Sequence, residues 1–286
     1  MITVFTPTYN RVKTLPRLYD SLKKQHYKDF EWLVIDDGSS DGTKEYIASL
    51  IKEDKIKINY IYKENAGKMS AVNLAHQKAK GEAFIAIDSD DMLYPNILKE
   101  LAHDYELIKD NEEVAGIVYL AAYESAIDKP IGSYLPSDMT ICKYIDLRIK
   151  YKVNGDKATL WKSKVLKNYA FPIIEGEKFI PDAYLMMQIS KKYQIMTLNK
   201  IVMLVEYQEN GLTNNYFSLV KHNPLGTSLY YKELYCFDKS IYNIYGYLLF
   251  CFFGHKKFKQ IVKEHSNKLL VLIMYLPVKI IALIRR

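Results

Sequence analysis

The stretch FEWLVIDDGSSDGT, residues 30–43, decides the fold expected for this chain. It begins as a short, mostly apolar strand, Phe30–Ile35, and passes into Asp36, Asp37 and a turn with two glycines. Residues 43–51 then show apolar residues at helical spacing. A strand that ends in carboxylates before a helix is typical of a parallel sheet, because such sheets bind ligands at the carboxyl ends of their strands.

The same alternation of strand and helix extends over the first 120 residues. The expected strands cover residues 2–6, 30–35, 58–62, 83–87 and 114–119, and the expected helices cover 14–25, 43–51, 69–79 and 98–108. This order predicts an α/β fold with a Rossmann-like, mostly parallel sheet and helices on both faces. Beyond it, the sequence predicts a strand at 159–161, a helix at 183–193, strand-like runs at 195–198 and 201–207, and a helical region from about 216.

Polar clusters follow the first four expected strands, at residues 6–11, 36–43, 64–68 and 88–91. Any one of them alone would be an ordinary loop. Because the carboxyl ends of parallel strands meet at one edge of a sheet, the four clusters together predict a binding site there.

The cluster Asp88-Ser89-Asp90-Asp91 places three carboxylates within four residues. These groups repel one another unless a positive charge lies among them, and oxygen ligands suit Mg²⁺ or Mn²⁺. Mg²⁺ usually binds through one or two carboxylates and substrate phosphates, so the pattern predicts a metal and diphosphate site. The alternative is a solvated acidic turn before the next helix.

The other clusters allow recognition of a nucleotide. A carboxylate in 36–43 can accept hydrogen bonds from a nucleobase or a ribose, and an aromatic ring in 6–11 can stack on a base. Lys68 can reach a phosphate as a point charge. A strand-to-helix turn and a solvated lysine are the simpler alternatives for the same residues.

Four segments carry a resemblance to a known family: TPTYNR at 6–11, DDGSSDGT at 36–43, NAGKMSAVN at 65–73 and DSDD at 88–91. In order and approximate spacing, they resemble the inverting, nucleotide-sugar-dependent glycosyltransferases of family 2, which have the A-type glycosyltransferase fold. A weaker similarity, to a bacterial subgroup that builds surface polysaccharides such as capsules, continues through 155–157, 176–182 and 207–213. The Gln-x-x-Arg-Trp motif of processive synthases is absent, which favours a single transfer.

The resemblance implies a role for each matching residue. Asp37 would hold the nucleobase, Asp90 would bind the divalent metal, and Asp88 would contact the metal or the nucleotide sugar. Asp182 would be the general base, with Glu175 and Glu177 as competing candidates in the same segment. The residues that would bind the nucleotide sugar are Pro7, Thr8, Tyr9, Asn10, Asp37, Asn65, Lys68, Asp88 and Ser89.

The implied enzyme moves a hexosyl or N-acetylhexosaminyl group, with inversion, from a nucleoside-diphosphate sugar such as a UDP-sugar. The acceptor would be a hydroxyl of a saccharide or a lipid-linked saccharide. The expected catalytic domain covers 1–215, with a nucleotide-binding half at 1–120 and an acceptor half at 121–215. Residues 216–286 would form a helical, basic, membrane-associating extension.

The charge distribution supports a membrane partner rather than a nucleic acid. Residues 251–286 hold eight of the 40 Lys and Arg residues and one of the 33 Asp and Glu residues, so residues 1–250 hold 32 of each. A neutral body lacks the basic face that nucleic acids need. Residues 241–253 and 269–284, the latter with Pro277, predict two helices in the membrane interface or, alternatively, helices packed as core.

Two other classes of protein match part of the pattern. Residues 85–90 also look like the first motif of aspartyl-phosphate phosphatases, with Asp88 as nucleophile and Asp90 as acid, although Met92 replaces the usual threonine. A non-catalytic, membrane-bound nucleotide-sugar-binding protein is the other alternative. Three scattered cysteines, Cys142, Cys236 and Cys251, indicate a reducing compartment. The expected location is therefore the cytoplasm, at the inner face of the plasma membrane.

Overall fold

The computed structural model describes residues 1–206 and 216–284, and the chain divides into two compact units. The first unit comprises Met1–Ala170 and the segment that starts at Ile189, and the second comprises Phe171–Gln188 and the chain after residue 207. Each unit has its own hydrophobic core. This division differs from the expected boundaries at 120 and 215, because strands beyond residue 120 complete the sheet of the first unit. The functional assignment of those segments stays a prediction.

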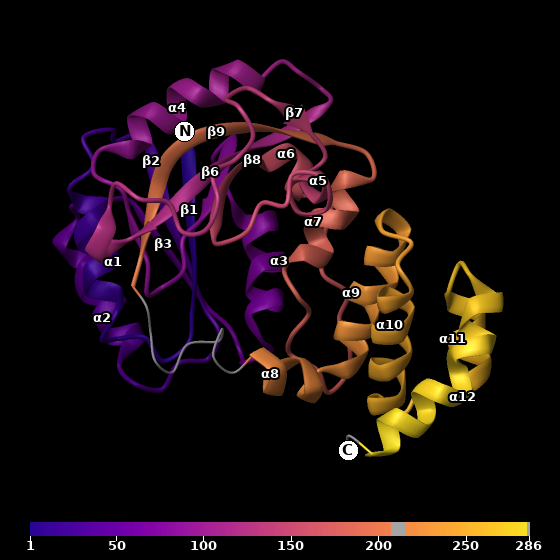
Figure 1. Cartoon of the computed structure of the whole chain (residues 1–286). Helices are drawn as coiled ribbons and strands as arrows, with labels where there is room; N and C mark the ends of the chain where they lie inside the picture. The colour runs from indigo at the N-terminus through magenta and orange to yellow at the C-terminus, as the bar shows by residue number, and fades with distance from the viewer. Residues whose placement is uncertain (207–215, 285–286) are drawn as a thin grey trace. The chain divides into compact units, whose positions relative to one another are not determined.

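The first unit contains a nine-stranded mixed sheet in the order β3-β2-β1-β4-β8-β6-β9-β5, with β7 paired to β9 (Figure 1). Within the described residues, β5, β7 and β8 run opposite to the other strands. The strands are β1 (Ile2–Thr8), β2 (Phe30–Asp36), β3 (Ile58–Tyr62), β4 (Ala83–Ala86), β5 (Met92–Leu93), β6 (Val114–Tyr123), β7 (Ile141–Cys142), β8 (Lys157–Lys162) and β9 (Gln194–Val205).

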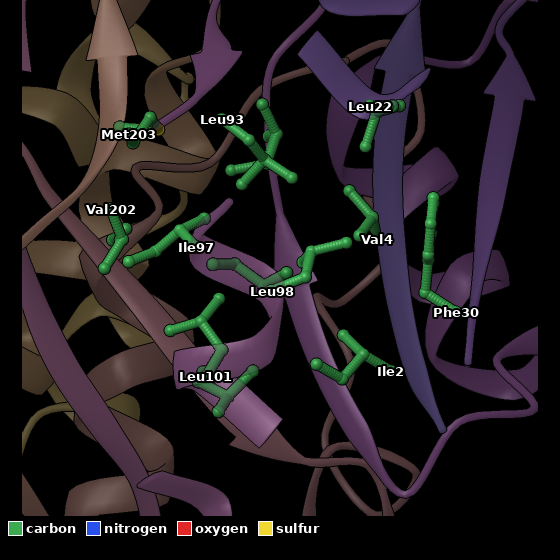
Figure 2. Packing of buried hydrophobic residues seen from close by; sticks show 14 of the residues in the cluster. Ile2, Val4, Leu22, Phe30, Leu93, Ile97, Leu98, Leu101, Val202 and Met203 are labelled. Carbon is green, nitrogen blue, oxygen red and sulfur yellow. The ribbon is translucent and has the colours of Figure 1, made fainter. Parts of the chain in front are cut away.

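Helices cover both faces of this sheet, as predicted. They are α1 (Leu15–Lys23), α2 (Thr43–Glu53), α3 (Lys68–Lys78), α4 (Ile97–Ile108), the 3-10 helix η1 (Glu124–Ala126), α5 (Tyr144–Ile149) and α6 (Ser163–Leu166). Apolar side chains of α1, α2 and α4 share a core with alternate residues of β1, such as Ile2 and Val4 (Figure 2). On the opposite face, His76 of α3 meets the ring of Phe84 edge-on. The two faces follow from the alternation of side chains along a strand.

The two strand-like runs expected at 195–198 and 201–207 form one strand, β9. The polar pair Asn199 and Lys200 between them suggested a break. In the structure Lys200 makes ion pairs with Glu100 and Asp104 of α4, so a charged residue is accommodated in the middle of the strand. The part of the second run from Tyr207 onward lies outside the described residues.

The second unit is helical. It contains most of α7 (Ala183–Ser190), which ends in the first unit, followed by α8 (Tyr216–His222), α9 (Pro224–Phe237), α10 (Ile241–Phe253), α11 (Phe258–Glu264) and α12 (Lys268–Ile284). Residues of α9 to α12 form its core, and Tyr247 of α10 lies at its centre with no exposed surface. Helix α12 continues through Pro277, where the sequence suggested a break. In the described part of the chain, no helix combines the length and the apolar character that crossing a membrane requires.

The two helices expected at a membrane interface differ in burial. Helix α10 is packed as core, because all residues from Gly246 to Phe252 are buried. The interfacial interpretation is therefore wrong for this part of α10, which packs against α9 and α12, although Ile241 and Tyr242 at its start are exposed. Helix α12 buries only Val271, Val278 and Ala282, and most of its other apolar side chains are exposed.

Candidate active site

The carboxyl ends of β1, β2, β3 and β4 lie at one edge of the sheet. These strands are parallel neighbours in the order β3-β2-β1-β4. Their carboxyl ends therefore bring together the four polar clusters that the sequence placed after them. This placement confirms the geometric part of the prediction, whereas the role of each residue stays a prediction.

Hydrogen bonds join the cluster after β1 to the cluster after β2. Asn10, which has a positive φ of 54°, donates its backbone N–H to Ser39 Oγ at 2.9 Å. Its side-chain Oδ1 accepts the N–H of Ser40 at 2.8 Å. Asp41 accepts the N–H of Val12 at 3.0 Å. The asparagine suits this position because its short polar side chain tolerates the left-handed conformation.

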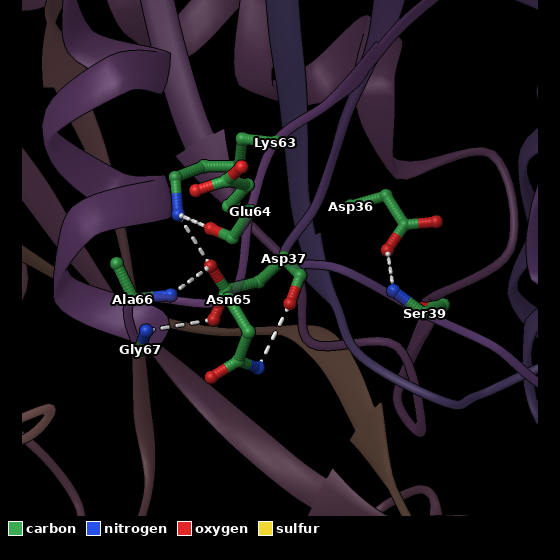
Figure 3. Close-up of polar contacts among 8 residues, drawn as sticks. All are labelled: Asp36, Asp37, Ser39, Lys63, Glu64, Asn65, Ala66 and Gly67. Atoms are coloured by element: carbon green, nitrogen blue, oxygen red, sulfur yellow. Dashed lines mark hydrogen bonds and ion pairs between the residues drawn. The ribbon is translucent and has the colours of Figure 1, made fainter.

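Asp37 joins the cluster after β2 to the loop after β3, as Figure 3 shows. Its carboxylate is nearly buried and accepts hydrogen bonds from Lys63 Nζ at 2.5 Å, Ala66 N–H at 2.9 Å and Gly67 N–H at 2.7 Å. Its carbonyl oxygen accepts the side-chain amide of Asn65 at 2.8 Å. Asp37 therefore fixes the loop that leads into α3, and Lys63 balances its charge.

The neighbouring Asp36 is fully buried and is also satisfied within the protein. One oxygen accepts the N–H of Ser39 at 2.8 Å, and the other accepts the hydroxyl of Tyr60 at 2.7 Å. Burial and this carboxylate raise the pKa of Tyr60, so its hydroxyl keeps its proton and remains the donor.

The last link joins Lys68, at the start of α3, to the cluster after β4. Lys68 Nζ forms an ion pair with Asp88 at 2.8 Å. Nearby, burial together with the negative charges of Asp88 and Asp90 raises the pKa of Asp91 to about 8, and Asp156 adds to the effect. The four polar clusters thus form a continuous network that ends in a group of carboxylates with surplus negative charge.

This surplus is the observation that bears on a metal. Carboxylate oxygens suit a hard divalent cation, and a cation would relieve the repulsion that adds to burial in raising the pKa of Asp91. Among the described residues, no three His, Cys, Asp or Glu side chains are grouped as a metal site. A magnesium or manganese ion here would be held by one or two carboxylates, such as Asp90 and Asp88, and completed by substrate phosphates, and its presence stays a prediction.

The other predicted donor-binding residues lie at the same edge. Tyr9 is half exposed, Pro7 is partly buried and Ser89 is buried. Thr8 is also buried, and its Oγ1 has no hydrogen-bond partner in the described part of the chain.

Sequence reasoning gave no role to two residues of this region, Lys63 and Asp156, although Asp156 lies in the segment 155–157 that shares the weaker family similarity. Lys63 follows β3 directly, so its position at the shared edge was a usable signal. Asp156 lies more than sixty residues beyond the DSDD cluster, just before β8. Its approach to Asp91 depends on the insertion of β8 next to β4.

The three candidate base residues lie in the second unit, where they differ in their surroundings. Glu177 accepts the N–H groups of Leu225 and Gly226 at the start of α9, both at 2.7 Å. Its carboxylate thus stabilises the N-terminus of that helix. Asp182, directly before α7, and Glu175 are exposed. Glu177 is therefore engaged at this helix N-terminus, and which of the three acids is the general base stays a prediction.

A mostly parallel sheet with a loop network and an acidic cluster at the carboxyl ends of its strands is typical of nucleotide-binding α/β proteins. Comparison with known families is more specific. Residues 3–158 match the model of glycosyl transferase family 2, and the chain belongs to this family. The match agrees with the resemblance of the four segments and favours a transferase over the phosphatase alternative.

Related proteins share part of the chain. A GalNAc(5)-diNAcBac-PP-undecaprenol beta-1,3-glucosyltransferase from Campylobacter jejuni is 31% identical over 175 residues, which are 59% of this chain and 54% of that protein. An uncharacterized glycosyltransferase from Rickettsia typhi is 37% identical over 136 residues, 47% of this chain and 40% of its own length. One from Rickettsia felis is matched over only 15% of its length.

Solved structures share the fold over almost the whole chain. S. aureus TarS, residues 1–349, in complex with UDP-GlcNAc superposes with a TM-score of 0.64 at 18% identity, covering 98% of this chain and 88% of that one. The mannosyltransferase PcManGT from Pyrobaculum calidifontis, in complex with GDP-Man and Mn²⁺, gives a TM-score of 0.57 at 19% identity, covering 99% and 74%. The fold is therefore the A-type glycosyltransferase fold that the sequence predicted.

Proposed function

We propose that this protein transfers a sugar, with inversion, from a nucleoside-diphosphate sugar to a hydroxyl of a saccharide or lipid-linked saccharide. The observation that carries the proposal is the hydrogen-bonded network from Asn10 through Asp37 and Lys68 to Asp88 in a family 2 chain. UDP-sugars are the preferred donor class, because the solved relative TarS binds UDP-GlcNAc. A hexosyl or N-acetylhexosaminyl group is the group transferred.

The donor is held by the loops after β1, β2 and β3. The exposed ring of Tyr9, beside Pro7, is available to stack on a nucleobase. Asp37 holds the loop 63–67 in place, and we expect the nucleobase to bind beside Asp37 and Asn65. Lys68 lies between this loop and the acidic cluster and provides a positive charge for the diphosphate.

Asp90 and Asp88 would hold a divalent cation, Mg²⁺ or Mn²⁺. When bound, the cation stabilises the negative charge that develops on the departing nucleoside diphosphate. Asp182 removes the proton of the acceptor hydroxyl as that oxygen attacks the anomeric carbon. One base suffices for direct displacement, so no covalent sugar–enzyme intermediate is required.

The acceptor and the location follow from the relatives and the charge distribution. The Campylobacter jejuni relative is named for an undecaprenol-linked acceptor. The basic, apolar end of this chain would place the enzyme on the inner face of the plasma membrane, where a lipid-linked saccharide is accessible. Synthesis of a cell-surface polysaccharide such as a capsule is the process that needs this reaction.

The test is release of the nucleoside diphosphate from a panel of UDP- and GDP-sugars with Mn²⁺ and a saccharide acceptor. Asp182→Asn is expected to lower the rate by about 10²–10⁴-fold, the usual contribution of a general base, while donor binding is kept. Glu175→Gln is the matched control in the same exposed segment. Full activity of Asp182→Asn together with loss in Glu175→Gln would move the base to Glu175. Absence of release with every donor would contradict the proposed function.

A further inference from the structure

The outer face of helix α12 is an exposed apolar stripe. Leu269, Leu276, Ile280 and Leu283 are 68%, 67%, 60% and 62% exposed, and Ile273 lies on the same face. Their spacing of three to seven residues places them along one side of a helix. The opposite side packs on α10 and α11 within the second unit. The second unit thus holds this helix in place while its apolar stripe remains uncovered.

A basic pocket of about 310 Å³ lies beside the stripe, between α10, α11 and α12. Lys256, Lys257 and Lys279 line it, together with the ring of Tyr275 and with Leu283 of the stripe. Lys256 is paired with Glu264 at 2.6 Å. Glu264 is the only acid of residues 251–284, so Lys257 and Lys279 leave a net positive charge in the pocket.

These two features together identify the chemistry of the partner. Transfer of an exposed apolar stripe from water into an apolar phase is favourable, and an adjacent pocket with surplus positive charge attracts an anion. A second copy of the chain packed on the stripe would bring Lys257 and Lys279 close to like charges, which repel. A bilayer with anionic lipids offers acyl chains and phosphates at the same boundary.

We propose that α12 lies in the plane of an anionic membrane surface. The stripe enters the acyl region, and the pocket holds the phosphate of a lipid headgroup between Lys257 and Lys279. This inference deepens the membrane association in the proposed function and rests on it. It assigns that association to α12 and the pocket, and it excludes the part of α10 from Gly246 to Phe252, which is buried in the core.

The test is co-sedimentation of the full chain with two kinds of vesicle, phosphatidylcholine alone and an equal mixture of phosphatidylcholine and phosphatidylglycerol. The wild-type chain is expected to bind the anionic vesicles much more tightly. Leu276→Ser is expected to weaken this binding about tenfold, since a leucine side chain leaves the apolar phase. The matched control is Ile173→Ser, because Ile173 is 94% exposed but lies outside α12.

The pocket is tested by neutralising both of its surplus lysines. Lys257→Gln with Lys279→Gln is expected to weaken binding to the anionic vesicles about fivefold for each lysine, and to leave the weak binding to neutral vesicles unchanged. The control is Lys52→Gln with Lys99→Gln, two exposed lysines of the first unit. All four lysines are exposed, so circular dichroism should show the same fold in each variant.

Three outcomes would overturn the inference. One is equal binding of both vesicle types, and another is unchanged binding of the stripe or pocket variants. The third is a dimer, measured by light scattering, that Leu276→Ser dissociates, because the stripe would then be an interface between copies. Donor binding by thermal shift is measured on the same samples. If the chain binds donor but no vesicle, the proposed reaction stands and the membrane surface of α12 is refuted. If it binds vesicles but no donor, only the proposed reaction is refuted.

Discussion

The two acidic turns of the first unit look alike in sequence and differ in the structure. Asp36 and Asp37 follow β2, and the cluster 88–91 follows β4, both at the same edge of the sheet. The carboxylates of the first turn accept hydrogen bonds from backbone N–H groups, a tyrosine hydroxyl and Lys63. In the second turn Lys68 pairs with Asp88, and burial, together with the charges of Asp88 and Asp90, raises the pKa of Asp91 to about 8.

The difference in charge balance indicates a different role for each turn. Asp37, whose charge is balanced by Lys63, organises a loop, whereas the carboxylates of the second turn keep surplus charge and are the ones that we propose hold a cation. The first turn should therefore contribute mainly to folding and to the shape of the donor site. The second should contribute mainly to catalysis. Variants at both turns test this contrast.

The largest effect is expected for Asp90→Asn. If Asp90 holds the proposed cation, its loss would weaken cation binding and the stabilisation of the leaving diphosphate, and we expect the rate of transfer to fall by about 10²–10³-fold. The free energy of unfolding should not decrease, because one of several repelling charges is removed. Nucleoside diphosphate release and urea denaturation measure the two quantities. A variant that is fully active, or that unfolds much more easily, would place Asp90 with the structural carboxylates.

Asp37→Asn should have the opposite profile. The amide that replaces one oxygen cannot accept a hydrogen bond, so the Ala66 or Gly67 N–H loses its partner and Lys63 loses its counter-charge. We expect the free energy of unfolding to fall by about 3 kcal/mol, which urea denaturation would reveal. Donor binding should weaken because the loop 63–67 is no longer fixed. Unchanged stability would show that the carboxylate is held in reserve for the donor.

Addition of Mn²⁺ distinguishes the turns without changing the fold. A ligand at a hundred times its dissociation constant stabilises the native state by about 2.7 kcal/mol. We expect the melting temperature of the wild-type chain to rise with Mn²⁺ and a nucleoside diphosphate. Asp37→Asn should have a lower melting temperature without ligand and should show part of the increase when Mn²⁺ and the nucleoside diphosphate are added. Asp90→Asn should show no increase. A chelator should reverse the effect.

The smallest effects are expected for the two lysines. Lys63→Met removes the partner of a nearly buried carboxylate, and we expect a loss of about 1–2 kcal/mol in the free energy of unfolding. The Lys68–Asp88 pair is more exposed, at 30% and 42% of the side-chain surfaces, so Lys68→Met should cost less than about 1 kcal/mol. Lys68→Met should instead weaken binding of the diphosphate. Equal losses of stability would remove the contrast between the turns.

The sequence was sufficient to predict the shared edge of the sheet, since the four strands and their polar clusters alternate regularly with helices. It was not sufficient for the role of β8, an antiparallel strand between β4 and β6 that brings Asp156 toward Asp91. It also did not separate Glu177 from Asp182, because only the fold brings Glu177 to the start of α9. Pairings between distant segments have no local signal in composition or spacing.

Sequence alone was enough for the main alternation of strands and helices in the first 120 residues, the edge that carries the polar residues and the family, because each of these depends on local periodicity or on short motifs. Only the three-dimensional fold shows which carboxylates have their charge balanced by a neighbouring lysine, and which of the two apolar helices is covered by other helices. Asp37 meets Lys63 across 26 residues, and α10 is enclosed by α9 and α12 while the stripe on α12 is left exposed. Charge balance and burial are properties of neighbours in space, and one-dimensional spacing does not encode them.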